Sequence, residues 1–297
     1  MSVRFGFGLG TQQVLQTPAD FNAVVDGLEE FGFDSLWLSE RVTGPPLDPL
    51  AAMGYVAGRT SRLKFGTSVL VLPGRNPVLL AKELATLDVL SSGRLLLAFG
   101  LGIVDPKEQQ AFDVQRAERG SLFDEALPLM RRLWREEEVT HHGDRFHVDG
   151  VTLQPRPVGR MEAWHSGNSP TELRRTGRLA DGWLGSLLTP AEAEQAREAI
   201  QEAAAQHDRK IDDDHFGATV IYAHDAFPPG LVELVEKRRP GRAPEDVVAR
   251  GGDALVSLLK GHVEAGLSKF VVVPSEPTRS WHDELGWLSS LVHPLQD

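Results

Sequence analysis

The 297-residue sequence contains no cysteine. This absence excludes disulfide bonds, thiolate nucleophiles, iron–sulfur clusters and cysteine-ligated zinc. The sequence also lacks any run that approaches the roughly 18–20 apolar residues needed for a membrane span. Its first residues, MSVRFGFGLG, contain no basic segment followed by an apolar run of signal-peptide length, so we expect a cytoplasmic protein.

Basic residues are too few to balance the acidic ones, since 31 Lys and Arg against 42 Asp and Glu give a net charge of −11. This balance disfavours nucleic acid and anionic lipid surfaces, and we expect neither as a partner. A phosphorylated ligand held by a few local donors is still compatible with it. A chain of this length buries roughly 75% of its unfolded surface, so core size is not limiting.

Short apolar runs alternate with helical stretches along the chain. The near-continuous apolar run of residues 270–273 is typical of a parallel strand buried on both faces. Expected strands lie at residues 3–9, 35–38, 63–72, 95–99, 162–165, 181–185, 216–223 and 269–273. Eight strand–helix units predict an α/β protein, a (β/α)8 TIM barrel formed as a single domain by residues 1–297. The alternation breaks at about residues 100–160, which we interpret as an insertion after strand 4.

Expected helices lie at residues 17–31, 49–60, 77–90, 122–135, 170–179, 190–207, 228–265 (one or more helices) and 281–291.

An open doubly wound sheet is the alternative fold. The glycines of residues 6–10 lack the third-glycine spacing of a dinucleotide fingerprint, and no helix follows them at once. The sequence therefore favours the closed barrel.

Barrel enzymes carry their chemistry at the carboxyl ends of the strands. The apolar strand that ends near His165 enters a small polar turn and then a helix with Pro170 in its first turn. Free N–H groups and the helix dipole make such a turn a phosphate site. Ser169 either adds a hydroxyl donor to this site or only caps the helix, and the local sequence leaves both readings open.

Glu40 and Arg41 follow the second strand, where adjacent opposite charges form either an acid/base pair or a structural ion pair. Three histidines, His141, His142 and His147, lie in a turn-rich segment without the helical spacing of metal ligands. We therefore predict no metal site.

The most specific pattern covers residues 63–102. An Arg-Asn-Pro turn at residues 75–77 precedes the run Ala-Thr-Leu-Asp-Val-Leu-Ser-Ser-Gly-Arg at residues 85–94. This pattern resembles the luciferase-like monooxygenase superfamily, with supporting matches at residues 31–37, 118–120 and 180–183. The resemblance implies a barrel with an insertion after the fourth strand and a flavin or deazaflavin at its carboxyl face. Within the superfamily, the chain is most similar to the branch that uses coenzyme F420, and FMN is the alternative cofactor.

The resemblance also implies where that cofactor binds. A non-prolyl cis peptide bond supports the ring in this superfamily, and the matching bond joins Ser68 to Val69. The turn from Gly167 to Ser169 matches the superfamily's phosphate loop. The predicted cofactor-binding residues are Ser39, Ser68, Val69, Gly102, His165, Ser166, Gly167, Asn168 and Ser169.

The predicted catalytic residues are Glu40, Arg41 and Glu108. Sugar-phosphate dehydrogenases of the superfamily carry Asp-His where this chain has Glu40-Arg41, and arginine is a poor base because it stays protonated. This difference disfavours alcohol oxidation and favours reduction of an activated double bond. Arg41 then stabilises a carbonyl oxygen and Glu40 bonds the ring, whereas Glu108 either donates a proton or only orders the insertion.

Three functions are compatible with this sequence. The first is an oxidoreductase that moves a hydride between F420 and a small organic substrate. The second is an FMN-dependent monooxygenase that works with a separate flavin reductase, and the third is a flavin-binding barrel without activity. The resemblance further implies pairing through helices as a homodimer.

Overall fold

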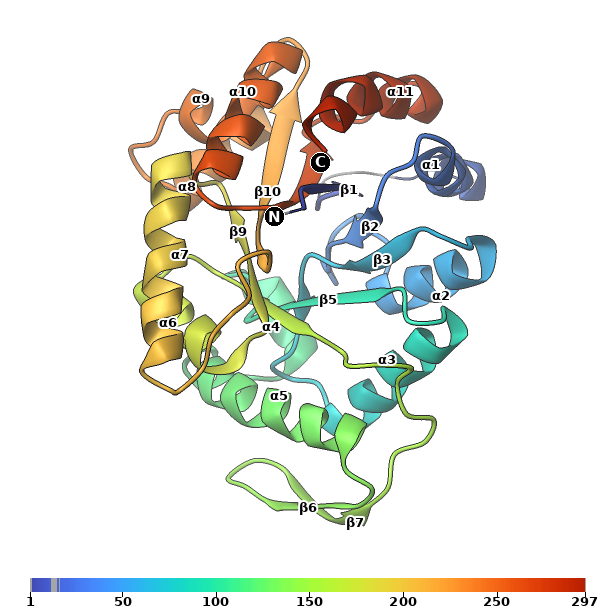
Figure 1. Cartoon of the computed structure of the whole chain (residues 1–297), viewed down its shortest axis with the longest axis vertical. Helices are drawn as coiled ribbons and strands as arrows, with labels where there is room; N and C mark the ends of the chain where they lie inside the picture. Colours follow the sequence, from blue (N-terminus) through green and yellow to red (C-terminus); the bar gives the residue numbers. More distant parts are fainter. Residues whose placement is uncertain (1, 12–14, 16, 297) are drawn as a thin grey trace.

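Eight parallel strands form a closed barrel at the centre of the computed structural model, which describes residues 2–11, 15 and 17–296 (Figure 1). The barrel strands are β1 (Arg4–Gly8), β2 (Ser35–Leu38), β3 (Lys64–Thr67), β5 (Leu95–Gly100), β8 (Ala163–Ser166), β9 (Gly182–Ser186), β10 (Phe216–Ala223) and β12 (Lys269–Pro274). Each strand pairs with the strand of the next unit, and the β12–β1 pairing closes the ring. The predicted (β/α)8 barrel is confirmed, and its closure excludes the open sheet.

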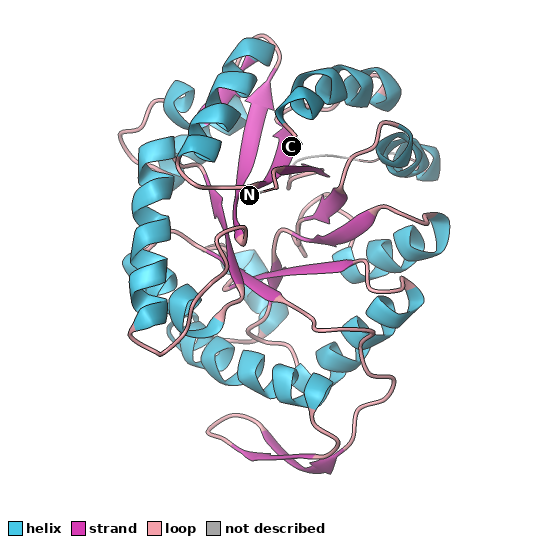
Figure 2. Cartoon of the chain, viewed as in Figure 1, coloured by secondary structure: helices cyan, strands magenta, loops and turns pink. Residues whose placement is uncertain are grey.

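A ring of helices surrounds the barrel, as Figure 2 shows. The helices that cover the strands are α1 (Pro18–Glu30), α2 (Pro49–Arg59), α3 (Pro77–Leu90), α5 (Arg119–Arg135), α6 (Pro170–Leu179), α7 (Pro190–Ala205), α10 (Gly251–Glu264) and α11 (Trp281–Val292). Many begin with a capping side chain followed by proline, as at Asp48, Asn76 and Ser169. The cap accepts bonds from free N–H groups of the first turn, and proline fixes φ for the helix.

Large side chains fill the barrel interior, and glycines make room for them. The interior cluster contains Trp37, Ala98, Trp164, Leu184, Val271 and Val273. A Cβ atom on Gly6 would lie 2.6 Å from Nε1 of Trp37, and one on Gly8 would lie 2.8 Å from a methyl group of Val271. The glycine-rich first strand therefore serves close packing rather than nucleotide binding.

The third strand differs from its prediction. A continuous strand was expected over residues 63–72, but the structure has β3 and a short β4 (Leu70–Val71) on either side of Ser68 and Val69. The strand β4 pairs with β5 near the carboxyl end of the barrel. The chain therefore bends at the position where the resemblance implies the cis bond.

Additional structure lies on both sides of α5. The segment of residues 101–118, within the insertion expected at about residues 100–160, contains α4 (Pro106–Phe112) and the 3₁₀ helix η1 (Arg116–Glu118). After α5, the strands β6 (Val139–His142) and β7 (His147–Val151) form a hairpin that projects from the ring (Figure 1). Because α5 packs between α3 and α6, it is a helix of the ring itself.

The connection after β10 forms a second elaboration. It contains α8 (Pro229–Arg238), α9 (Pro244–Val247) and the strand β11 (Val248–Arg250), which pairs with β10 and was not predicted. The 3₁₀ helix η2 (His293–Leu295) follows α11. Among the described helices, none has the length and apolar character to cross a bilayer.

Candidate active site at the carboxyl end of the barrel

Four strand ends bring most of the predicted site residues to one mouth of the barrel. Ser39 to Arg41 follow β2, Ser68 and Val69 follow β3, Gly102 follows β5, and Ser166 to Ser169 end β8 and begin α6. These four strands are consecutive in the ring, and adjacent strands lie about 4.8 Å apart. The mouth is therefore narrow enough for one ligand to contact all four segments.

The peptide bond between Ser68 and Val69 is cis, as the resemblance implies. The hydroxyl of Ser39 donates to the Ser68 carbonyl oxygen at 2.8 Å, and the Glu40 amide donates to the Val69 carbonyl oxygen at 3.2 Å. A Cβ atom on Gly100 would lie 2.6 Å from the Val69 side chain, so Val69 packs directly over β5. The bulge is thus held from the β2 side and from the β5 side.

Glu40 stabilises this bulge through contacts with Val71 and Arg75. Its side chain is only 2% exposed, accepts a hydrogen bond from the Val71 amide at 2.7 Å and pairs with Arg75. Nε of Arg75 in turn donates to the Val71 carbonyl oxygen at 3.0 Å. Burial raises the pKa of Glu40, although the charge of Arg75 opposes the shift. The prediction that Glu40 bonds a ring is not supported, because its carboxylate is buried against Val71 and Arg75.

Arg41 remains partly exposed at the mouth, with 27% of its side chain accessible. It lies 3.2 Å from Asp105 and 3.3 Å from Glu108, measured from guanidinium nitrogen to carboxylate oxygen. Both acids belong to the start of α4, so the elaboration after β5 holds Arg41 in place. Arg41, the cation predicted at this rim, is therefore held in position by the carboxylates of Asp105 and Glu108.

Glu108 is held as an anion. Its carboxylate accepts hydrogen bonds from the Thr43 amide at 2.8 Å, the Thr43 hydroxyl at 2.6 Å and the Val42 amide at 3.2 Å. Burial raises the pKa of Glu108, but these hydrogen bonds and the charge of Arg41 outweigh it, so the pKa lies below its usual range. Of the two roles left open for Glu108, this geometry favours the ordering role, because the residue joins the start of α4 to the loop after β2.

The turn after β8 has the shape of an anion site. Gly167 adopts a φ of +132°, a conformation that side chains rarely permit, and its carbonyl oxygen accepts from Trp183 Nε1 at 3.0 Å. The Asn168 amide group donates to the Ser186 carbonyl oxygen at 2.7 Å, which ties the turn to β9. The other side-chain atom of Asn168, Oδ1, is buried without a partner among the described residues.

Ser169 caps α6 and also binds an oxyanion. Its hydroxyl and its backbone N–H both donate to a carboxylate oxygen of Glu172, at 2.9 and 3.2 Å. A Cβ atom on Gly167 would lie 2.5 Å from the same carboxyl group. These contacts form a capping box, so the capping role of Ser169 is observed, and its role as a phosphate donor stays a prediction.

His165 does not contribute its side chain to the mouth. The ring is fully buried on the helix side of β8, with Nδ1 3.0 Å from the Thr176 hydroxyl and the ring centre 4.8 Å from that of Phe123. Burial lowers its pKa to about 3, so the ring is neutral. The prediction of His165 as a cofactor-binding residue is wrong, because alternation along β8 directs Trp164 inward and His165 outward.

Gly102 lies in a loop held by Arg119, which belongs to the matched residues 118–120 but had no predicted role. Arg119, at the start of α5, donates to the Leu101 carbonyl oxygen at 2.8 Å and is 2% exposed. Gly102 has a φ of +80°, and a Cβ atom there would lie 2.6 Å from the guanidinium group. No local sequence signal links this arginine to the loop, because the contact spans the whole of α4.

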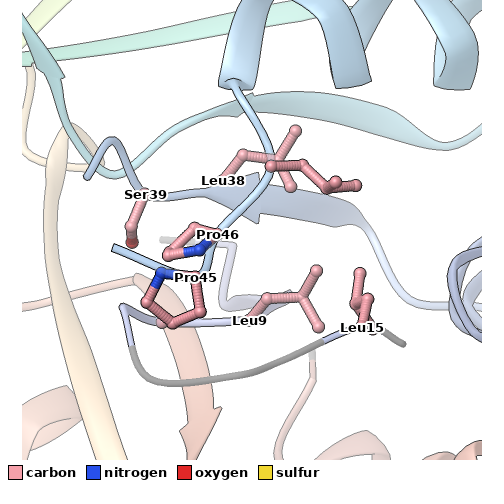
Figure 3. A pocket seen from close by; sticks show the side chains of 8 residues that line it. Leu9, Leu15, Leu38, Ser39, Pro45 and Pro46 are labelled. Carbon is pink, nitrogen blue, oxygen red and sulfur yellow. The ribbon is translucent and has the colours of Figure 1, made fainter. Parts of the chain in front are cut away.

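A narrow apolar slot adjoins Ser39. Figure 3 shows Leu9 and Leu15 on one side of this slot, with Pro45 and Pro46 across from them. Its free volume is about 10 Å³, room for about one water molecule. The slot therefore fits a small apolar group rather than a ring system.

A second cation reaches the mouth from α8. Leu231 and Val235 pack against Leu187 beyond the end of β9, which lays α8 over the rim. Arg238 at the end of this helix is exposed to solvent, although partial loss of hydration and then the positive charge of Arg41 lower its pKa. Within the described part of the chain, no carboxylate forms an ion pair with Arg238. The segment of residues 228–265 was predicted as helical, but nothing in it indicated a positive charge near Arg41.

The histidines of the projecting hairpin pair with carboxylates. His141 lies 3.1 Å from Glu125, and His142 lies 2.9 Å from Asp149. Among the residues that the structure describes, no group of three or more potential ligands is arranged to hold a metal ion.

Comparison with known proteins places this geometry in a family. The family model described as luciferase-like monooxygenase matches residues 1–228. The chain is 32% identical over 204 residues to the F420-dependent glucose-6-phosphate dehydrogenase of Kineococcus radiotolerans, covering 62% of this chain and 60% of that protein. The corresponding protein of Amycolatopsis mediterranei is 29% identical over 298 residues, covering 86% and 88%.

The fold is also found among solved structures. An F420-dependent secondary alcohol dehydrogenase, solved with an F420–acetone adduct, superposes over the full length of both chains with a TM-score of 0.83 and 18% identity. At this identity the likeness shows the fold alone. Since the family model spans well over half of the chain, the protein belongs to the luciferase-like monooxygenase family.

Proposed function

We propose that this protein is an oxidoreductase that transfers a hydride between the deazaflavin coenzyme F420 and a small organic substrate. The observation that carries the proposal is the meeting, at one barrel mouth, of the Ser68–Val69 bulge and the anion-binding turn at Gly167. The names of the curated relatives support F420 as the cofactor. Their whole-chain activity is extended to this protein only as part of the proposal.

The residues at the mouth fit such a coenzyme. The hydroxyl and amide of Ser169 donate to one carboxylate oxygen of Glu172, and a Cβ atom on Gly167 would meet that carboxyl group, so a phosphate would take the place of Glu172 at these donors. These residues would hold the phosphate end, and the bulge at Ser68 and Val69 would support the ring. When bound, a deazaflavin supplies two-electron hydride chemistry, while the protein supplies orientation and electrostatics.

Two cations act on the substrate side. Arg41 is fixed by two carboxylates yet partly exposed, and the exposed Arg238 lies near enough to Arg41 for the two positive charges to repel. Guanidinium groups in a partly desolvated mouth stabilise negative charge that develops on a carbonyl oxygen. Arg41 cannot accept a proton as a base, so the arrangement favours reduction of an activated substrate over oxidation of an alcohol.

The alternative is an FMN-dependent monooxygenase that receives reduced flavin from a separate reductase. The same turn binds any phosphorylated flavin, so the phosphate site alone does not distinguish the two cofactors. The curated relatives are named as F420-dependent enzymes, and this supports F420 over FMN as the cofactor.

Titration of the purified protein with each cofactor tests the proposal. We expect F420 to bind with a change in its fluorescence and FMN to bind at least about tenfold more weakly, a difference of about 1.4 kcal/mol. Gly167→Val should abolish binding, because its side chain meets Glu172 and its φ is unsuitable. Gly159→Val is the matched control, since nothing lies within 4 Å of that position.

The outcomes separate the candidates. Tight binding of FMN without F420 would support the monooxygenase, and binding of neither cofactor would refute both enzymes. Binding of F420 without turnover across a panel of activated alkenes and carbonyl compounds would support the third candidate, a cofactor-binding barrel without catalytic activity.

A further inference from the structure

A basic groove lies on the outside of the helix ring, apart from the barrel mouth. It has a volume of about 270 Å³ and is formed by α5, α6 and the end of α7. The residues that line it are Asp124, Thr171, Arg174, Arg175, Arg178, Ala203, Gln206 and His207. We call it the α6 groove.

The arginines of the α6 groove form one stripe. Positions 171, 174, 175 and 178 are spaced three and four residues apart, so they share one face of α6. Asp124 of α5 accepts from Arg175 Nε at 2.7 Å and from Arg178 Nη2 at 2.6 Å. One carboxylate therefore serves two guanidinium groups.

The charges of the groove do not balance. Three arginines and one aspartate leave a surplus of two positive charges, in a chain whose net charge is −11. The polar contact of the Arg174 side chain in the groove is the hydroxyl of Thr171, at 3.3 Å. Arg174 is exposed and forms no ion pair among the described residues, so its guanidinium group is available to a ligand at the wall of the groove.

We infer that the α6 groove binds an oxyanion, a carboxylate or a phosphate, between Arg174 and Arg178. Guanidinium groups present paired donors that match the two oxygens of such anions. Both Arg175 and Arg178 pair with Asp124, but Arg175 is only 9% exposed and fixes the floor of the groove, whereas Arg178 is 39% exposed and keeps N–H groups for an anion. The surplus of positive charge excludes a cation as the occupant.

The bound anion has two possible sources with the same chemistry. It is either a free metabolite or the anionic end of a ligand whose other end lies in the barrel mouth. The second source is within reach, because Thr171 follows the capping Ser169 by two residues along the same helix. The site itself does not depend on the proposed function, since it can be measured without a coenzyme.

Calorimetric titration of the full chain with inorganic phosphate and with tricarballylate tests the inference. We expect saturable binding that weakens with added salt, and at least an about tenfold loss of affinity in the double variant Arg174→Gln/Arg178→Gln. The matched control is Arg4→Gln/Arg135→Gln, which removes the same charge from exposed positions outside the groove. Thermal unfolding of each variant checks that the fold is retained.

Loss of binding in the groove variant alone supports the site. Absence of binding to the wild type, or equal loss in both double variants, overturns it, because the effect is then nonspecific charge. A parallel titration with F420 identifies the source. A weaker F420 affinity in the groove variant assigns the anion to the coenzyme, and an unchanged affinity assigns it to a free metabolite.

Discussion

Replacement of Arg75 by methionine tests whether the support beneath the bulge is electrostatic. The variant leaves the Glu40 carboxylate, which is 2% exposed, without its charged partner. Removing one partner of a buried ion pair costs about 3–5 kcal/mol. Since 23% of the Arg75 side chain is exposed, water screens part of this effect, and we expect about 2–3 kcal/mol near pH 8.

The penalty depends on pH in a direction that the burial of Glu40 determines. Burial raises the pKa of Glu40 even with Arg75 present, and loss of Arg75 raises it further. Between its unfolded and folded pKa values, the folded state binds more protons, so stability falls as pH rises through this range. The Arg75→Met variant should therefore be close to wild type near pH 5 and lose about 5–10 °C in Tm near pH 8.

Thermal unfolding at the two pH values measures this difference. Glu40→Gln/Arg75→Met is the matched variant, because it removes both charges and keeps an acceptor for the Val71 amide. We expect it to regain part of the lost stability near pH 8 and to show no extra pH dependence. An equal loss of Tm at both pH values, or a double variant no better than the single one, would refute the electrostatic account.

Three further predictions concern single residues. His165, with a pKa of about 3, should give NMR signals that do not titrate from about pH 5 to 8. His165→Leu should change F420 affinity by no more than about twofold. A tenfold loss of affinity would show that His165 takes part in F420 binding. Glu108→Gln should cost about 1–3 kcal/mol in urea unfolding at neutral pH and nothing once acid protonates Glu108, because a lowered pKa contributes stability only above that pKa. Arg238→Gln should raise KM for substrate about tenfold while F420 affinity is retained, and a parallel loss of both would place Arg238 in the coenzyme site instead.

Much of the fold could be predicted because its signals are local. The helix at Pro77–Leu90 and the strands at Ser35–Leu38 and Phe216–Ala223 have the bounds expected from apolar spacing and from proline or serine at their ends. The cis bond between Ser68 and Val69 came from the resemblance and not from spacing. Without that resemblance, residues 63–72 read as one continuous strand.

Side-chain direction explains the errors at the site. The period of two along a strand directs Trp164 and Ser166 to one face of β8 and His165 to the other, so this error was avoidable. Glu108 was different, because its acceptor role depends on amides of residues 42 and 43, about 65 positions away. Arg119 and Arg238 likewise act across distances in sequence that no local pattern records.

The cations near the mouth differ in whether the protein supplies an anionic partner, and this difference bears on the proposed chemistry. Arg75 is matched by the buried Glu40, and Arg41 by Asp105 and Glu108, so these cations are held by the protein itself. Arg238 has no such partner among the described residues, and the field of Arg41 makes its charge costlier still. A group that gains negative charge during reduction relieves this repulsion, whereas a neutral group does not. Under the proposed function, the mouth would therefore stabilise an oxyanion that develops in the transition state of hydride transfer.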